Sequence, residues 1–208
     1  MLNKQGFDLW ANEYDRTVQV SEESNLYPFA GYKGILNRIF SEVMQHEGAR
    51  VLDIGFGTGI LASKLYENGH SIDGVDFSPE MIAIAKEKMP KANLLEWDIT
   101  DGLPPEMDGK SYDAIISTYA LHHLADEKKW PFIASLVERL SSDGKLFIGD
   151  IAFGTRAELE RCRLDSLDYW DGDEFYFVFD ELKAGLSESG RCEFHPVSHC
   201  GGVIVVSR

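Results

Sequence analysis

The feature that most constrains the fold of this chain is a regular alternation of short apolar runs with helical patterns from Arg50 onward. Five runs of strand length are separated by segments whose apolar residues recur at helical spacing, and two more follow near the C-terminus. The runs are 50–54, 71–75, 92–97, 112–117, 145–151, 192–198 and 202–207. This alternation predicts an α/β fold in which helices cover both faces of a mostly parallel sheet.

The last two runs are joined by a link around Cys200 to Gly202 that is too short for a crossover helix. We therefore expect this pair to be antiparallel, whereas right-handed crossovers make the rest of the sheet doubly wound. The prediction is a doubly wound, mostly parallel, seven-stranded sheet with an antiparallel last strand.

The length of 208 residues favours a single domain overall. Helical spacing before the first strand predicts an N-terminal helical cap over residues 1–48, followed by the α/β domain over residues 49–208. Between the fifth and sixth runs lies an aromatic and acidic segment of about residues 154–180, which we call the insertion.

Charge and cysteine content exclude several classes of partner and site. With 20 basic and 35 acidic residues the net charge is −15, which disfavours nucleic acids and anionic membranes as partners. The three cysteines, an odd number without a C-x-x-C pair, indicate neither a disulfide framework nor a cysteine zinc site. No targeting or membrane-spanning pattern is visible, so we expect a cytoplasmic protein.

The most specific motif is a glycine-rich loop after the first run, with Gly55, Gly57 and Gly59, followed by Asp76 at the end of the second run. Such glycines let the backbone approach a ligand closely, and an acid after the second strand can accept hydrogen bonds from ribose hydroxyls. The dinucleotide fingerprint requires glycine where this chain has Ile60, which counts against an NAD-dependent oxidoreductase. The alternative reading of the loop is a plain strand-to-helix turn.

With Asp53 directly before it, the loop has the pattern D-x-G-x-G-x-G, which resembles motif I of class I S-adenosylmethionine-dependent methyltransferases. The resemblance extends to W-A-N-E-Y-D at 10–15, to Asp98, to the segment 112–124 and to the terminal strand pair. Within that superfamily the chain is most similar to small bacterial YrrT-like methyltransferases. The resemblance implies a Rossmann-like methyltransferase fold, with S-adenosylmethionine as cofactor and S-adenosylhomocysteine as product.

The resemblance also implies cofactor-binding roles for individual residues. Those expected at the methionine part are Asp53, Gly55, Gly57, Gly59 and Ser117. Those expected at the ribose and adenine are Asp76, Phe77, Asp98 and Ile99. Tyr14 would close over the cofactor from the cap. Asp98 is also well placed to cap a helix, and Tyr14 is also the last core-facing position of its helical stripe.

An alcohol, phenol or amine acceptor must lose a proton, and the candidate bases are His122 and Tyr119. We predict no metal site at His122 and His123, because adjacent residues point to different faces of a helix.

The segment 117–120, S-T-Y-A, lacks the N/D-P-P-Y/F pattern that amino-directed nucleic-acid methyltransferases place there. Together with the charge, this favours a small-molecule acceptor, and a monomer or homodimer. Tyr169, Trp170 and Phe175 of the insertion are expected either to line the acceptor pocket or to pack in the core. The alternative function is a non-catalytic protein that binds S-adenosylmethionine or S-adenosylhomocysteine.

Overall fold

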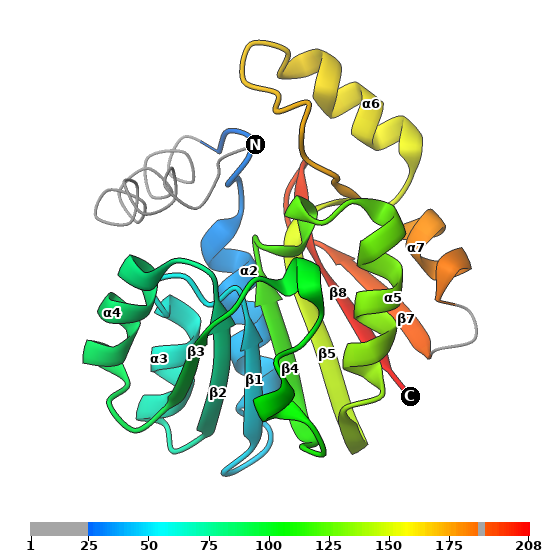
Figure 1. Cartoon of the computed structure of the whole chain (residues 1–208). Coiled ribbons are helices and arrows are strands. Elements are labelled where there is room, and N and C mark those ends of the chain that lie inside the picture. The colour runs from blue at the N-terminus through cyan, green and yellow to red at the C-terminus, as the bar shows by residue number, and fades with distance from the viewer. Residues whose placement is uncertain (1–24, 187–189) are drawn as a thin grey trace.

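The computed structural model describes residues 25–186 and 190–208, and its centre is a twisted sheet with helices on both faces (Figure 1). The strands are β1 (Arg50–Ile54), β2 (Ser71–Asp76), β3 (Asn93–Glu96), β4 (Tyr112–Thr118), β5 (Leu140–Phe153), β6 (Phe177–Val178), β7 (Arg191–Pro196) and β8 (Gly201–Ser207). The α-helices are α2 (Tyr32–Val43), α3 (Ile60–Glu67), α4 (Pro79–Lys88), α5 (Asp126–Val137), α6 (Arg156–Asp165) and α7 (Phe179–Gly185). Short 3₁₀ turns are η1 (Ile99–Asp101), η2 (Pro105–Met107) and η3 (Leu121–His123). The expected first helix, with Tyr14, lies outside the described residues.

The order of the strands is β3-β2-β1-β4-β5-β8-β7, and β6 pairs with β5 beside this path. Strands β1 to β5 run parallel, whereas β8 is antiparallel to both β5 and β7. The doubly wound, mostly parallel sheet with an antiparallel last strand is therefore confirmed. The predicted count of seven strands was wrong, since the described part of the sheet has eight. The additional strand, β6, has only two residues, which pair with Ala152 and Phe153, and so short a pairing leaves no pattern in the sequence.

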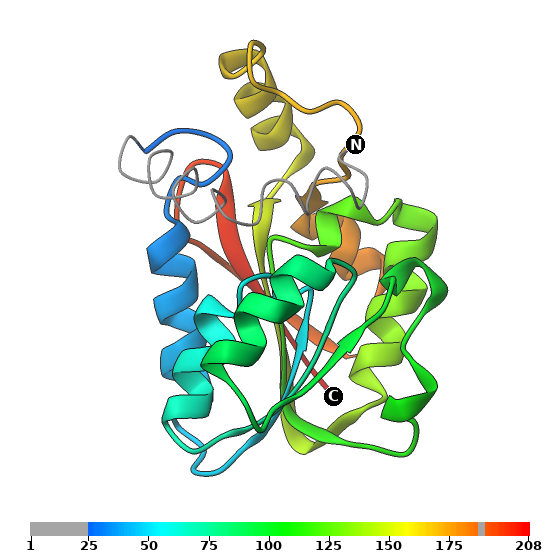
Figure 2. The same ribbon diagram turned by 60° about the vertical axis from the view of Figure 1, so that its left-hand side comes forward.

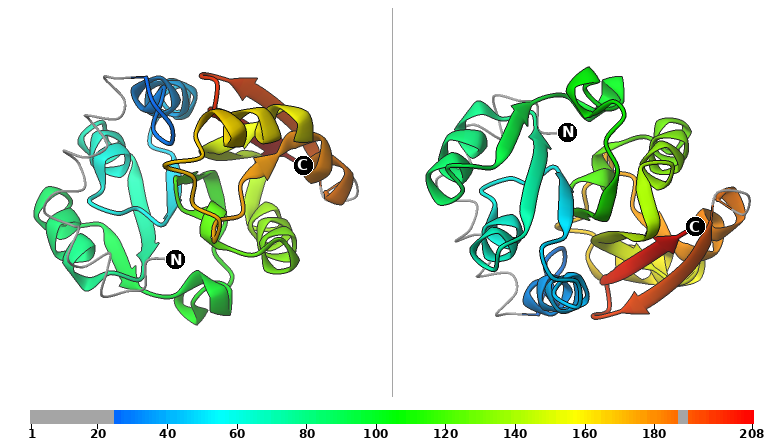
Figure 3. Two further views of the ribbon diagram at one scale, coloured as in Figure 1. Left: turned by 90° about the horizontal axis from the view of Figure 1, so that it is seen from above. Right: turned by 90° about the horizontal axis from the view of Figure 1, so that it is seen from below.

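Two apolar cores lie on opposite faces of the sheet, because alternate side chains of a strand point to opposite sides. Val51 packs in the core that α2, α3 and α4 cover, whereas its neighbour Leu52 packs in the core beneath α5 and α7. The views along the vertical axis show α2 and α5 on opposite sides of the sheet (Figure 3). Both faces are thus closed, as a parallel sheet requires.

Local signals account for the helix starts that frame the site. Ser78 caps α4, where its side chain accepts a hydrogen bond from the Met81 N–H, and Pro79 occupies the first turn. Thr155 and Glu158 form a reciprocal capping box at the start of α6. Helix α6 follows the carboxyl end of β5 and stands above that edge of the sheet (Figures 1 and 2). No helix in the described residues is long and apolar enough to cross a bilayer.

Candidate functional site

A cavity of about 590 Å³ opens at the carboxyl ends of the parallel strands. It is lined by the loop after β1, the end of β2, the segment from β3 into η1, and the segment after β4. Its size is typical of small-molecule sites, and its place is where doubly wound sheets bind their ligands.

The three glycines of the loop all have positive φ, but they serve different ends. Gly55 and Gly57 line the cavity. A Cβ on Gly57 would meet nothing within 4 Å, so a ligand can approach the backbone of the loop directly. Gly59 is not among the lining residues. A Cβ there would lie 2.9 Å from Met89 Cε, so this glycine lets α3 pack closely against the end of α4.

Asp76 lines the cavity and anchors the loop from the end of β2. Its Oδ2 accepts a hydrogen bond from the Gly57 N–H at 2.8 Å, and its Oδ1 accepts one from the Ser78 N–H at 2.9 Å. Each carboxylate oxygen has a second lone pair, so the same group could still accept from ribose hydroxyls.

Asp53 is a buried acid in the wall of the cavity, with an exposed fraction of 2%. Its Oδ1 has no hydrogen-bond partner among the described residues. Burial, together with the charge of Asp76, raises the pKa of Asp53 to about 8. A buried carboxyl oxygen without a partner, on a residue that lines a ligand cavity, matches a cationic group such as an ammonium.

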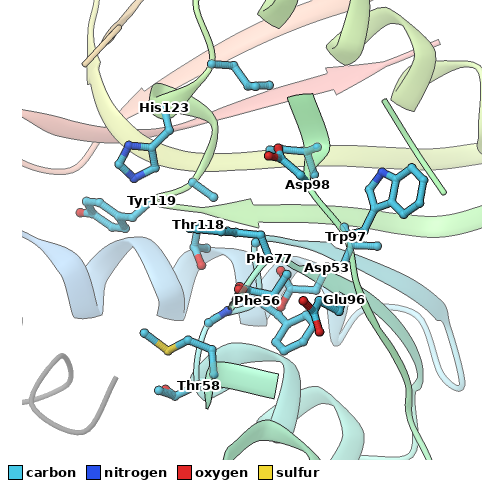
Figure 4. Close-up of a pocket in the computed structure, with 18 of the residues that line it drawn as sticks. Asp53, Phe56, Thr58, Phe77, Glu96, Trp97, Asp98, Thr118, Tyr119 and His123 are labelled. Atoms are coloured by element: carbon cyan, nitrogen blue, oxygen red, sulfur yellow. Dashed lines mark hydrogen bonds between the residues drawn. The ribbon is translucent and has the colours of Figure 1, made fainter. Parts of the chain in front are cut away.

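The residues labelled in Figure 4 line two sides of the cavity. Trp97 and Asp98 lie at one end, and Tyr119 and His123 lie at the other. Phe77 and Ile99 line the cavity as well. Asp98 Oδ1 also accepts a hydrogen bond from the Thr100 N–H at 2.8 Å, so the acid both caps η1 and borders the cavity.

Ser117, expected near the methionine part, is fully buried and is not among the lining residues. Its Oγ donates to the Ile54 carbonyl at 3.0 Å and so ties β4 to β1. Thr118, which the sequence analysis missed, lines the cavity together with Tyr119. Tyr119 has a φ of +51°, which is uncommon for an aromatic residue and is typical of functional sites.

Of the two histidines in η3, His123 lines the cavity, whereas His122 is buried behind it. His122 Nδ1 lies 2.6 Å from Asp150 Oδ1. Burial alone would lower the pKa of His122, but Asp150 and Glu174 raise it to about 9. Burial and the neighbouring His122 lower the pKa of His123 to about 4. The structure thus presents His123, and not the expected His122, to the cavity.

The histidine pair does not have the α-helical geometry on which the expectation of no shared ion depended. The two residues belong to a 3₁₀ turn and not to an α-helix, and their ring centroids lie 4.1 Å apart. A carboxylate does reach them, but from the insertion: Glu174 Oε1 lies 3.5 Å from His122 Nε2 and 3.6 Å from His123 Nδ1.

The aromatic residues of the insertion are not among the described lining residues. Trp170 stacks on Tyr27 with a centroid distance of 5.1 Å, and Tyr176 meets Trp170 edge to face. Tyr169 is 78% exposed. Trp170 is therefore placed by its contacts with Tyr27 and Tyr176. A contribution of the insertion to an acceptor pocket stays a prediction.

A family model described as a methyltransferase domain matches residues 51–144. An uncharacterized methyltransferase of Geobacillus sp. (strain WCH70) is 34% identical over 193 residues, which cover 88% of this chain and 87% of the relative. Another, from Geobacillus thermodenitrificans, is 40% identical over 193 residues, which cover 88% and 86% of the two chains.

Solved structures show the same fold. A TehB-like SAM-dependent methyltransferase from Corynebacterium glutamicum matches with a TM-score of 0.64 and 20% identity, over 95% of this chain and 97% of that one. The complex of DhpI with SAH matches with a TM-score of 0.70 and 20% identity, over 97% and 93%. The narrower resemblance to YrrT-like members stays a prediction. Relatives at 34% and 40% identity that align over most of both chains show that the chain belongs to this family of methyltransferases, and its fold is the one seen in S-adenosylmethionine-dependent methyltransferases.

Proposed function

We propose that this protein binds S-adenosylmethionine in the cavity and transfers its methyl group to a small-molecule acceptor. The observation that carries the proposal is the buried carboxyl group of Asp53, which lines the cavity and whose Oδ1 has no hydrogen-bond partner among the described residues. When bound, S-adenosylmethionine supplies a methyl group already activated on a sulfonium.

The residues present fit such a molecule along the length of the cavity. Asp53 offers a hydrogen-bond acceptor to the ammonium of the methionine part. The absence of a side chain at Gly57 leaves space for that part of the molecule. Asp76 offers acceptors to the ribose hydroxyls. Asp98 and Phe77 border the end where the adenine would lie. Tyr14 remains a proposed closing residue outside the described part of the chain.

The acceptor would then lie at the opposite end, beside Tyr32, Tyr119 and His123. Aromatic walls with a few polar groups suit a small, partly apolar molecule. The hydroxyl of Tyr119 and the imidazole of His123 are placed to orient such an acceptor. The net charge of −15 argues against a nucleic-acid acceptor.

Calorimetric titration with S-adenosylhomocysteine, S-adenosylmethionine and NAD tests the cofactor. We expect saturable binding of the first two and none of NAD, and the reverse pattern would refute the proposal. Turnover is then sought with alcohols, phenols and amines by following formation of S-adenosylhomocysteine. His123→Ala should lose turnover yet keep S-adenosylhomocysteine binding. Unchanged turnover in this variant would place the acceptor elsewhere.

A further inference from the structure

Three side chains behind the acceptor end of the cavity bring their donor atoms together: His122 Nε2, His123 Nδ1 and Glu174 Oε1. The carboxylate oxygen lies 3.5 Å and 3.6 Å from the two nitrogens, and all three atoms lie within 4.8 Å of one another. Hydrogen bonds of nitrogen to oxygen are shorter, at about 2.7–3.2 Å. Around tetrahedral zinc, bonds of about 2.0–2.2 Å place neighbouring ligand atoms about 3.3–3.6 Å apart. The two nitrogen-to-oxygen separations match neighbouring ligands of one ion better than direct hydrogen bonds.

Two of the three donors are oriented by a second residue. His122 Nδ1 lies 2.6 Å from Asp150 Oδ1, and when that nitrogen carries the proton, Nε2 presents its lone pair to the cluster. Tyr176 donates its hydroxyl to Glu174 Oε2 at 2.7 Å, which leaves Oε1 directed at the histidines. A carboxylate behind a ligating histidine is the usual outer shell of a protein zinc site.

The backbone holds Glu174 in place although it comes from the insertion. The next residue, Phe175, donates its N–H to the His122 carbonyl at 2.8 Å. Its own carbonyl accepts a hydrogen bond from the buried ammonium of Lys129, which also pairs with Asp126 at 3.1 Å. The carboxylate is therefore positioned before any ion binds, so little ordering is left for the binding step.

We propose that His122, His123 and Glu174 bind one divalent transition-metal ion of the Zn²⁺ type. Two imidazoles and a carboxylate suit such ions, whereas Mg²⁺ and Ca²⁺ prefer sets of oxygen ligands. Glu174 and the nearby Asp150 supply carboxylates that offset the charge of the ion. Three protein ligands leave a fourth position open, as in catalytic zinc sites, and His123 belongs to the cavity wall. The ion would accordingly stand at the acceptor end, where it could polarise an acceptor oxygen.

The test uses the full chain without a histidine tag, stripped with a chelator and titrated with Zn²⁺ by calorimetry. No cofactor is added, so the result does not depend on the proposed function. We expect one equivalent of Zn²⁺ to bind and to raise the melting temperature, and Mg²⁺ not to compete. Co²⁺ should give the visible absorption bands of a low-coordinate site.

His123→Ala and Glu174→Gln should each weaken Zn²⁺ binding at least about tenfold. The matched control is Glu193→Gln, which removes the carboxylate of the exposed pair between His195 and Glu193 at 3.8 Å and should leave binding unchanged. Circular dichroism shows whether each variant is folded. If folded wild-type protein does not bind Zn²⁺, or if His123→Ala and Glu174→Gln bind it as tightly as wild type, the cluster is an ion-pair network only.

Discussion

Replacing Asp53 by asparagine should stabilise the ligand-free protein while weakening its ligand binding. Burial and the charge of Asp76 raise the pKa of Asp53 from 3.8 to about 8. At about 1.36 kcal/mol per pKa unit, ionising Asp53 in the folded protein costs about 6 kcal/mol more than in the unfolded chain. Asparagine has nearly the same volume and no charge, so the variant avoids this cost.

The sign of the effect follows from proton binding. Between pH 3.8 and about 8, folded protein keeps a proton on Asp53 that the unfolded chain has released. The contribution of this residue to stability therefore falls as pH rises through that window and stays low above it. We expect Asp53→Asn to raise the free energy of unfolding by at most about 2 kcal/mol at pH 5 and about 6 kcal/mol at pH 9. Urea unfolding followed by circular dichroism at both pH values measures the difference.

Ligand binding should change in the opposite direction. An ammonium beside Asp53 favours the carboxylate, so S-adenosylhomocysteine should bind wild type more tightly as pH rises towards 8 and should release a proton near pH 7. Loss of a hydrogen bond between charged groups costs about 1.5–3 kcal/mol, or roughly 10- to 100-fold in affinity, in Asp53→Asn. Calorimetry in two buffers of different ionisation enthalpy measures both the affinity and the number of protons released on binding.

Asp113→Asn is the matched control at the opposite end of the strands. The pKa of Asp113 is lowered, because hydrogen bonds from the Arg50 N–H and Ser141, with the charge of Arg50, outweigh its partial burial. Its asparagine variant should lose stability above about pH 4, where Asp53→Asn gains it. A less stable Asp53→Asn at pH 9, or unchanged S-adenosylhomocysteine affinity in that variant, would refute the reasoning.

Three further predictions follow from contacts around the cavity. Asp76→Ala should weaken S-adenosylhomocysteine binding by about 2–4 kcal/mol. Asp76→Asn should weaken it less, because the amide oxygen keeps one of the two backbone N–H bonds whereas the amide nitrogen cannot accept the other; wild-type affinity of Asp76→Ala by calorimetry would contradict this. Gly59→Ala should lower the free energy of unfolding by about 1–3 kcal/mol, since φ is +74° and the new Cβ would lie 2.9 Å from Met89 Cε. Gly48→Ala should lower the free energy of unfolding less, because its φ is also positive but its Cβ would meet nothing within 4 Å. If denaturant unfolding showed equal losses of stability in the two variants, the contact with Met89 would not contribute. Lys129→Met should speed amide hydrogen exchange in the insertion, because the Phe175 carbonyl loses its donor, and unchanged exchange by mass spectrometry would mean that other contacts suffice.

The sheet was predictable because its signals are local. Each parallel strand is an apolar run that ends at a turn, so the alternation alone places β1 to β5, and the short link before β8 gives the antiparallel pair. The loop glycines and Asp76 stand out in the sequence for the same reason, and their cofactor-binding roles stay predictions. Strand β6 was missed because two residues become a strand only when the insertion lies against the end of β5.

The structure departs from the expected site where a shift of one residue changes the direction of a side chain. Strand β4 continues to Thr118, so Ser117 points into the sheet and its successors line the cavity. The histidine pair adopts a 3₁₀ turn, which directs both rings at a shared neighbour. That neighbour, Glu174, is distant in sequence, and nothing in the local pattern marks it.

The position of β8 has a consequence for biosynthesis. It fills the gap between β5 and β7, although it follows both of them along the chain. While the ribosome is still making the preceding residues, β5 lacks a neighbour along this edge and β7 has nowhere to dock. Each then exposes unpaired backbone groups that could associate with other nascent chains. Synthesis of Gly201–Ser207 therefore closes the sheet in one late step, and a ribosome that pauses just before it would prolong the interval in which the chain is prone to aggregate.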